Sequence, residues 1–173
     1  MHKQEPDSHV EIFTMSPIGL IHTPFKQAEG TPIQPTAAEG IHGVVELYPR
    51  FVSGLRDVAG FDRLWLIYLL DRASAVQLVV RPYLDSEERG VFATRSPARP
   101  NAIGLSAVRL LGVEENRLLI AGVDMLDGSP LLDIKPYVPA FDCFNLARAG
   151  WYTGKTAAGV VADNRFEAQL PPR

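Results

Sequence analysis

Short apolar runs rich in branched and aromatic residues recur along this chain and are separated by Pro and Gly. Runs of this kind, bounded by turn residues, predict β-strands. The run Leu64–Leu70 is apolar on both faces, which predicts a buried strand with Trp65 in the core. The predicted strands are 17–22, 43–47, 64–70, 75–83, 90–93, 106–113, 117–124 and 130–134, with 106–113 and 117–124 forming a hairpin.

The remaining segments supply little helix. Phe51, Leu55 and Val58 lie at helical spacing and predict a short helix within 49–58. Many short strands and turns favour an all-β fold, a single closed or nearly closed β-barrel, over alternating βαβ units. Segment 23–40 is rich in Pro, Gly and Ala and predicts a long loop, a kind of segment that is often functional. We expect a flexible N-terminal tail (1–10), a barrel domain (11–140) and a C-terminal extension (141–173) that packs on the barrel or on a partner subunit.

Composition narrows the class of protein. The 173 residues fit one domain, and 46% hydrophobic with 21% charged residues is ordinary for a globular protein. The net charge of -3 lacks the basic excess typical of nucleic-acid binders, although a local basic patch is compatible with the five arginines between Arg81 and Arg109. The single cysteine, Cys143, excludes an intramolecular disulfide and is predicted to be a small buried residue. With no apolar signal-peptide core and no run near the roughly 20 residues of a membrane helix, we expect a cytoplasmic protein without membrane contact.

Several common site motifs are missing from the sequence. It has no dinucleotide-binding G-x-G-x-x-G after a predicted strand, no P-loop and no G-x-S-x-G elbow. None of the four histidines pairs with Cys or Glu at the spacing of metal ligands. We therefore predict no metal site and no doubly wound nucleotide-binding fold.

Segment 90–106 carries the strongest candidate chemistry. It places Arg95 and Arg99, with Pro97 and Pro100, in a stiff loop between two apolar strands. Guanidinium groups are forked donors that suit a carboxylate or phosphate, and prolines reduce the entropy lost when a ligand orders the loop. The alternative is two structural arginines that hold carboxylates across strands.

Two acidic runs follow, at 124–130 and 133–137. Asp127-Gly128 is a strong turn signal, and a turn alone explains it without a ligand. Carboxylates at Asp124 and Asp127 can also accept hydrogen bonds from ribose hydroxyls or from an amino group. Asp133 and Lys135 share one face of a strand, where a surface ion pair is the simpler role.

The run A-T-R-S-P-A-R-P-N at 93–101, taken with D-M-L-D-G-S-P-L-L-D-I-K-P-Y at 124–137, resembles the TsaA-like family, also called TrmO. The resemblance covers about 16–137 and implies a β-barrel methyltransferase that uses S-adenosylmethionine and pairs as a homodimer. Longer members methylate N6-threonylcarbamoyladenosine beside the tRNA anticodon and add a C-terminal domain thought to help hold tRNA. This sequence ends before such a domain, so tRNA is a weaker inference than the methyl donor. A non-catalytic sensor or accessory protein that binds S-adenosylmethionine, and a methyltransferase acting on a small molecule, stay open.

The resemblance also implies roles for individual residues. In the family the arginine of the A-T-R-S run contacts the methyl donor, so Arg95 is expected to bind the carboxylate of the donor. Apart from the resemblance, a nearby carboxylate is expected to take the proton of a weakly nucleophilic acceptor nitrogen, and the candidates are Asp127 and Asp133. Asp71-Arg72 stands where tRNA-modifying bacterial members have His-Gln. The expected acceptor-binding residues are Arg99, Asn101, Lys135 and Tyr137. The expected donor-binding residues are Gln34, Pro35, Thr36, Ala37, Asp71, Arg72, Arg95, Leu105, Asp124, Leu126, Asp127 and Gly128.

Overall fold

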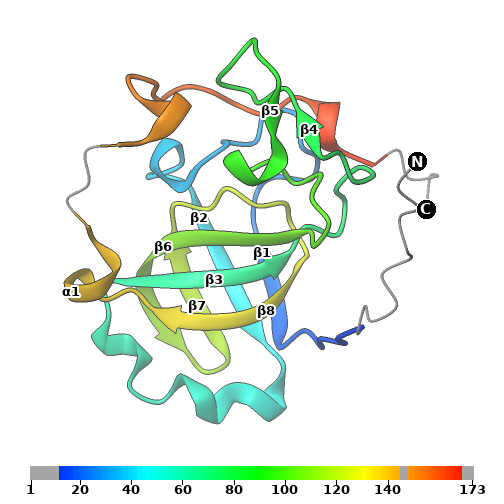
Figure 1. The fold of residues 1–173 in the computed structure, drawn as a ribbon. Coiled ribbons are helices and arrows are strands. Elements are labelled where there is room, and N and C mark those ends of the chain that lie inside the picture. Colours follow the sequence, from blue (N-terminus) through cyan, green and yellow to red (C-terminus); the bar gives the residue numbers. More distant parts are fainter. Residues whose placement is uncertain (1–11, 145–147, 169–173) are drawn as a thin grey trace.

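The structure, a computed structural model, describes residues 12–144 and 148–168. The predicted tail, 1–10, lies outside these residues. Six strands close into an antiparallel barrel in the order β1-β2-β7-β6-β3-β8, and β4 and β5 form a separate two-stranded sheet (Figure 1). The predicted all-β barrel is confirmed. The strands are β1 (Gly19–His22), β2 (His42–Leu47), β3 (Arg63–Leu69), β4 (Val79–Val80), β5 (Arg89–Gly90), β6 (Ile103–Glu114), β7 (Arg117–Ala121) and β8 (Ser129–Pro136).

Helical structure is confined to short pieces. The segment predicted as a helix at 49–58 is a 3₁₀ segment, Pro49–Leu55, followed by a second one at Val58–Gly60. Ser53 and Gly54 inside the first segment have low helix propensity, and Asp57 between the two segments has a left-handed backbone with φ of +65°, which prevents one continuous α-helix. The α-helix α1 (Pro139–Asp142) follows β8, and the other 3₁₀ segments are Pro35–Ala37, Val91–Ala93, Gly150–Tyr152 and Asn164–Phe166.

The predicted strands 75–83 and 90–93 shrink to the two-residue strands β4 and β5. Their apolar residues serve a small separate core instead of a long ladder: Val80, Val91 and Ala98 are buried against Phe166 from the C-terminal segment. Residues 71–101 and 148–168 together form a cap above the barrel, here called the upper lobe (Figure 1).

Strand β3 is buried on one face only, contrary to the prediction. Leu64, Leu66 and Tyr68 are buried in the barrel, and the residues between them are half-buried. Trp65 is therefore no core residue; its ring lies outside the barrel, 5.5 Å from the ring of Tyr137. An antiparallel barrel has a single packed interior, so alternate residues of each strand face outward even where the run is wholly apolar.

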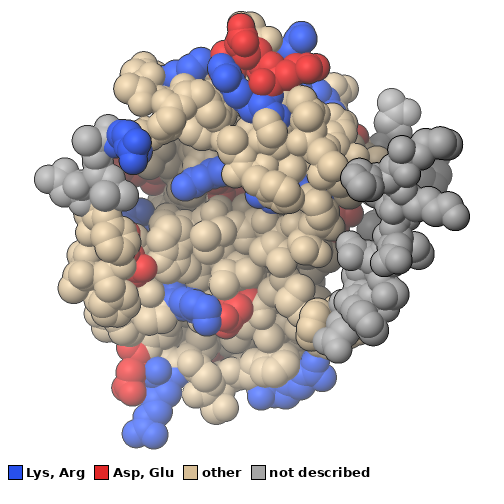
Figure 2. Space-filling view, in the orientation of Figure 1, with Lys and Arg blue, Asp and Glu red and all other residues tan. Residues whose placement is uncertain are grey.

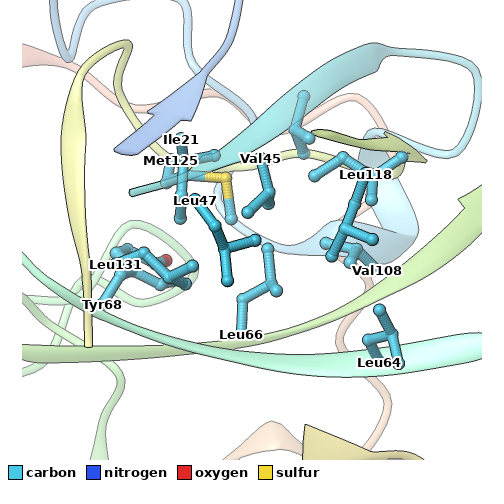
Figure 3. Packing of buried hydrophobic residues seen from close by; sticks show 12 residues of the cluster. Ile21, Val45, Leu47, Leu64, Leu66, Tyr68, Val108, Leu118, Met125 and Leu131 are labelled. Atoms are coloured by element: carbon cyan, nitrogen blue, oxygen red, sulfur yellow. The ribbon is translucent and has the colours of Figure 1, made fainter. Parts of the chain in front are cut away.

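The barrel interior is one continuous hydrophobic cluster (Figure 3). Alternation along the strands places its members, because every second side chain points inward. The buried members are Ile21, Val45, Leu47, Leu64, Leu66, Tyr68, Val108, Leu118, Ile120, Val123, Met125 and Leu131. Cys143 lies outside any core and is exposed, so the prediction that it is buried was wrong. Among the described residues, no helix combines the length and apolar character needed to cross a membrane.

The described C-terminal segment binds back onto loops of the same chain. The amide of Ala162 donates to the carbonyl oxygen of Thr31 at 2.7 Å, and the amide of Ser74 donates to that of Phe166 at 2.8 Å. The indole N–H of Trp151 donates to the carbonyl oxygen of Ala93 at 2.7 Å. This segment therefore joins three loops at one end of the barrel. The division into domains at 11–140 and 141–173 stays a prediction.

Candidate functional site

A cavity of about 400 Å³ lies between the upper lobe and the end of the barrel. Figure 2 shows a hollow between these two parts, with basic side chains along its border. The volume falls within the usual range of small-molecule sites. Segments from several parts of the chain line it: loop 28–34, barrel residues of β3 and β6 that include Tyr68 and Ser106, segments 70–73 and 82–84, the arginine loop 94–99, segment 124–126, and Tyr152 and Phe166 from the C-terminal segment.

The arginine loop contributes both of its predicted residues, in different ways. Arg95 is exposed at the cavity, and its Nη1 donates to Oε1 of Gln34 at 2.6 Å, which joins two loops far apart in sequence. Arg99 turns back on its own loop, because its Nη1 donates to the carbonyl oxygens of Thr94 at 3.0 Å and Ser96 at 3.2 Å. Arg95 therefore presents a charge to the cavity, and Arg99 mainly fixes the shape of the loop.

Asp124 lies at the wall of the cavity in a buried polar network. Ser106 Oγ donates to Asp124 Oδ1 at 2.6 Å, and the Tyr68 hydroxyl lies 3.1 Å from the same Ser106 oxygen. Burial raises the pKa of Asp124 to about 7, against the opposing effects of the Ser106 hydrogen bond and the Arg95 charge. Burial also raises the pKa of Tyr68, which keeps its proton and can donate it in the network.

Asp127 is held outside the cavity lining by a different set of contacts. Its Oδ2 accepts a hydrogen bond from Lys26 Nζ at 2.6 Å, and its Oδ1 accepts one from the amide of Thr23 at 3.0 Å. Partial burial disfavours its charge, but these contacts outweigh burial and lower the pKa of Asp127. Gly128 follows with φ of +76°, a conformation that favours glycine, so the Asp127-Gly128 pair forms the expected turn.

Arg72 links this turn to the cavity. Its Nη2 donates to the carbonyl oxygen of Asp127 at 2.7 Å, and its Nε is buried without a hydrogen-bond partner in the described part of the chain. The carboxylate of Asp71 lies 3.6 Å from that Nε. Both residues line the cavity, so the pair that departs from the expected His-Gln still lies at the site.

The structure brings together some of the predicted site residues and separates others. Those that line the cavity are Gln34, Asp71, Arg72, Arg95, Arg99, Leu105, Asp124 and Leu126. Those outside its lining are Pro35, Thr36, Ala37, Asn101, Asp127, Gly128, Asp133, Lys135 and Tyr137. Asp133 and Lys135 form a partly exposed ion pair with 2.8 Å between Lys135 Nζ and Asp133 Oδ2, the simpler of their two expected roles.

Sequence reasoning missed several residues at the cavity. Tyr68 and Ser106 lie on the inward-facing sides of β3 and β6, where the neighbouring alternate residues are buried and apolar. A polar side chain on such a face is the signal by which the sequence could have revealed them. Trp65 lines the cavity because it lies on the outer face of β3 and not inside the barrel. Tyr152, Phe166 and Glu167 come from the C-terminal segment, where no pattern predicts their position.

The described residues contain no group of three or more His, Cys, Asp or Glu side chains placed to hold a metal ion. The arrangement instead offers a fixed positive charge at Arg95, a buried carboxyl group at Asp124, and apolar walls at Leu105, Leu126 and Phe166. Such a site can bind a zwitterionic ligand with a flat apolar part.

Comparisons with known proteins show the family of the chain. The model of the tRNA-methyltransferase O N-terminal domain matches residues 20–143. A probable S-adenosyl-L-methionine-binding protein of Pyrococcus abyssi is 54% identical over 135 residues, which cover 78% of this chain and 73% of the relative. A human tRNA (adenine(37)-N6)-methyltransferase is 34% identical over 133 residues, covering 73% of this chain and 30% of the relative.

The crystal structure of TrmO from Pseudomonas aeruginosa matches with a TM-score of 0.69 and 41% identity. The match covers 82% of this chain and 63% of the TrmO chain, so this chain spans less than two thirds of that protein. The family match covers both sequence runs that resembled TsaA-like proteins, at 93–101 and 124–137. The chain belongs to the TrmO family of S-adenosylmethionine-dependent methyltransferases.

Proposed function

We propose that this chain is an S-adenosylmethionine-dependent N-methyltransferase whose acceptor is N6-threonylcarbamoyladenosine beside the tRNA anticodon. The observation that carries the proposal is the cavity, which places Arg95 and Asp124 at one end of a barrel of the TrmO family. Bound S-adenosylmethionine supplies a methyl group already activated on a positively charged sulfur. The protein therefore has to position the two reactants more than it has to activate them.

The cavity residues fit the chemical groups of the donor. Arg95 suits its carboxylate, because a guanidinium is a charge-assisted donor that stays charged at all working pH values. Arg72 and Asp71, an ion pair with 3.6 Å between Nε and Oδ1, also line the cavity and add a donor and an acceptor for hydroxyl or amino groups. Tyr83 and Phe166 give the flat adenine an apolar wall.

The identity of the acceptor rests on the relatives. The human relative is named a tRNA (adenine(37)-N6)-methyltransferase, and this chain spans only 30% of it. Arg89 and Lys155 lie at 5.7 Å and 5.6 Å from the ring of Trp151, beside the cavity residue Tyr152. Both cations also pair with Asp85, which leaves one net positive charge beside the aromatic rings, a combination that suits a phosphate next to an unstacked base.

A second candidate is a non-catalytic S-adenosylmethionine-binding protein. The Pyrococcus abyssi relative carries a binding name rather than an enzyme name, and Asp71-Arg72 replaces the expected His-Gln at the cavity. A methyltransferase that acts on a small molecule is the third candidate. All three candidates share the donor site. They differ in whether a methyl group is transferred and in which molecule accepts it.

We also propose that two copies of the chain pair through the outer face of β3, β6 and β8. Leu105 is 55% exposed and Ile103 is 37% exposed on this face, next to the cavity. Figure 2 shows few charged side chains on the face below the hollow. A cytoplasmic location stays a prediction. Light scattering at micromolar concentration tests the dimer, and a monomer that persists at high concentration would contradict it.

The test of the proposed function is methyl transfer from S-adenosylmethionine with a labelled methyl group. The protein is incubated with bulk tRNA that contains N6-threonylcarbamoyladenosine and, in parallel, with tRNA from cells that cannot make this nucleoside. The proposal predicts label in the first tRNA and none in the second. Donor binding without label in any tRNA would favour the binding protein, and S-adenosylhomocysteine release with small molecules alone would favour the third candidate.

A further inference from the structure

Asp124 has the surroundings of a proton acceptor, which neither the sequence motifs nor the relatives' names assign to it. We propose, building on the methyltransferase function above, that Asp124 is the catalytic base that takes the proton of the acceptor nitrogen, with Ser106 and Tyr68 as its positioning residues. Both positioning residues come from barrel strands, so the base stands on a rigid support.

The geometry leaves one carboxylate oxygen for the reaction. Asp124 Oδ1 accepts the 2.6 Å hydrogen bond from Ser106, and among the described residues the other hydrogen bond that favours the ionised carboxylate comes from the backbone of Asp124 itself. Ser106 is 1% exposed and is itself 3.1 Å from the Tyr68 hydroxyl, so the chain of contacts is buried up to the cavity. One oxygen is therefore fixed by the protein, and the other is available to an acceptor bound in the cavity.

The other carboxylates near the site are engaged elsewhere or displaced. Asp127 is tied to Lys26 and Thr23 outside the cavity lining. Of the other carboxylates that line the cavity, Glu167 accepts a hydrogen bond from the amide of Ala28 at 3.2 Å, and Asp71 lies against Arg72. Asp133 is paired with Lys135 outside the cavity. Asp124 alone in this group lines the cavity and has one oxygen held by a buried side chain of a barrel strand, Ser106.

Methyl transfer with Asp124 as the base needs no other co-reactant. The lone pair of the acceptor nitrogen forms a bond to the methyl carbon, the bond between that carbon and sulfur breaks, and its electron pair stays on sulfur as S-adenosylhomocysteine. The N–H proton moves to Oδ2 of Asp124, and the resulting carboxylic acid later releases it to water. An amide-like nitrogen is a weak nucleophile, so removal of its proton during attack lowers the barrier.

The protonation behaviour of Asp124 supports the role. Burial raises its pKa to about 7, and a base works best when its pKa lies near the working pH. The charged group that acts on it across the cavity is Arg95, which favours the ionised form, and the neighbouring titratable group is Tyr68 on β3, which stays neutral. Asp127 contrasts with it, since the contacts from Lys26 and Thr23 lower its pKa and make it a weaker base.

The test compares single-turnover methyl transfer by the wild type, Asp124→Asn and Ser106→Ala over pH 5 to 9, with donor affinity measured on each by calorimetry. Glu114→Gln is the matched control, because this exposed carboxylate ends β6 at the side of the barrel away from the cavity. We expect the wild-type rate to rise with pH through about 7 and Asp124→Asn to lose roughly 10²- to 10⁴-fold in rate with donor affinity within threefold. Ser106→Ala removes a hydrogen bond that lowers the Asp124 pKa, so its rate midpoint moves to higher pH.

A donor affinity that falls as far as the rate in Asp124→Asn would overturn the proposal, because Asp124 would then be a donor ligand. An unchanged rate in that variant, or a Ser106→Ala midpoint equal to the wild type, would also overturn it. A second readout needs no turnover: carbon NMR of the Asp124 carboxyl group should titrate near pH 7 in the free protein and higher in Ser106→Ala. If the wild type binds the donor but methylates nothing, the proposed methyltransferase function is wrong. The NMR titration then measures the pKa of the Asp124 carboxyl group without a link to catalysis.

Discussion

The aromatic ring of Tyr68 occupies the space in which a side chain at residue 104 would lie. Tyr68 and Gly104 are direct partners in the β3–β6 ladder, and a Cβ built on Gly104 would overlap the ring carbons of Tyr68. Because position 104 has no side chain, the Tyr68 ring can extend across β6 and place its hydroxyl beside Ser106. A glycine in one strand therefore helps to set the hydrogen-bond network that holds Asp124.

Gly104→Ala tests this packing relationship. The added methyl group must displace a buried ring, so we expect a loss of about 1–3 kcal/mol in the free energy of unfolding. Gly112→Ala on the same strand is the control, since its nearest neighbour would be Leu119 Cδ1 at an ordinary 3.8 Å. Urea unfolding of both variants makes the comparison, and equal stability of the two would show that Tyr68 moves aside without cost.

The stability of the wild type should depend on pH through Asp124. Its pKa is about 7 in the folded protein and near 3.8 when unfolded, so between these values the folded state binds more protons. The contribution of this group is therefore fully present below about pH 4 and is lost as pH rises to about 7, by an amount on the order of 2–4 kcal/mol.

Asp124→Asn removes the group that titrates. We expect the variant to gain thermal stability over the wild type at pH 8 and to lose that gain at pH 5, as measured by melting curves in matched buffers. Ser106→Ala should not abolish the wild-type pH dependence, because the carboxyl group is still buried. A constant difference between Asp124→Asn and the wild type at both pH values would show that Asp124 titrates normally.

The two arginines of the loop should respond differently to substitution. Arg95→Ala removes an exposed charge at the cavity and is expected to weaken S-adenosylmethionine binding by roughly 1–3 kcal/mol with little change in stability. Arg99→Ala releases the carbonyl groups of Thr94 and Ser96 and is expected to destabilise the loop as well. Calorimetry and melting curves of both variants separate the effect on binding from the effect on stability. Arg109→Ala, at an exposed arginine of β6, is the control. A loss of affinity in all three variants would show that binding depends on the overall positive charge and not on a site at Arg95.

The C-terminal segment should be needed for donor binding. Phe166 is 5% exposed and fills the small core of the upper lobe with Val80, Val91 and Ala98. Phe166→Ala should loosen that lobe and weaken donor binding at least about tenfold, while circular dichroism still shows the barrel. Phe141→Ala, at a residue 65% exposed, is the control. Full affinity in Phe166→Ala would mean that this wall of the cavity is dispensable.

Sequence patterns predicted the barrel because a strand with one buried face shows apolar residues at every second position. The hairpin of β6 and β7 shows this most clearly, since Val108 and Leu118 face inward at the spacing that the pattern requires. Periodicity could not show that the apolar run around Val80 serves a separate core, because its partner Phe166 is remote in sequence. The prediction for Trp65 was wrong for a different reason. An unbroken apolar run does not show which face of the strand points into the barrel.

The site was predictable where motifs concentrate its residues and unpredictable where burial decides the chemistry. Arg95 and Asp124 both reach the cavity, as the two runs suggested. Nothing in the sequence distinguishes Asp124 from Asp127, because the difference comes from the desolvation of Asp124 at the cavity wall and from Lys26, which contacts Asp127 from about a hundred residues away. The resemblance therefore pointed to residues that line the cavity, while the proposal of Asp124 as the base depends on the structure.

The cavity beside Arg95 and Asp124 is expected to bind S-adenosylmethionine, and the decisive experiment is a calorimetric titration of the wild-type protein with this donor. We expect saturable binding at one site per chain, with S-adenosylhomocysteine competing for the same site. Absence of binding by the folded wild type would contradict the account, because the family barrel would then be present without the donor site on which the proposed function depends.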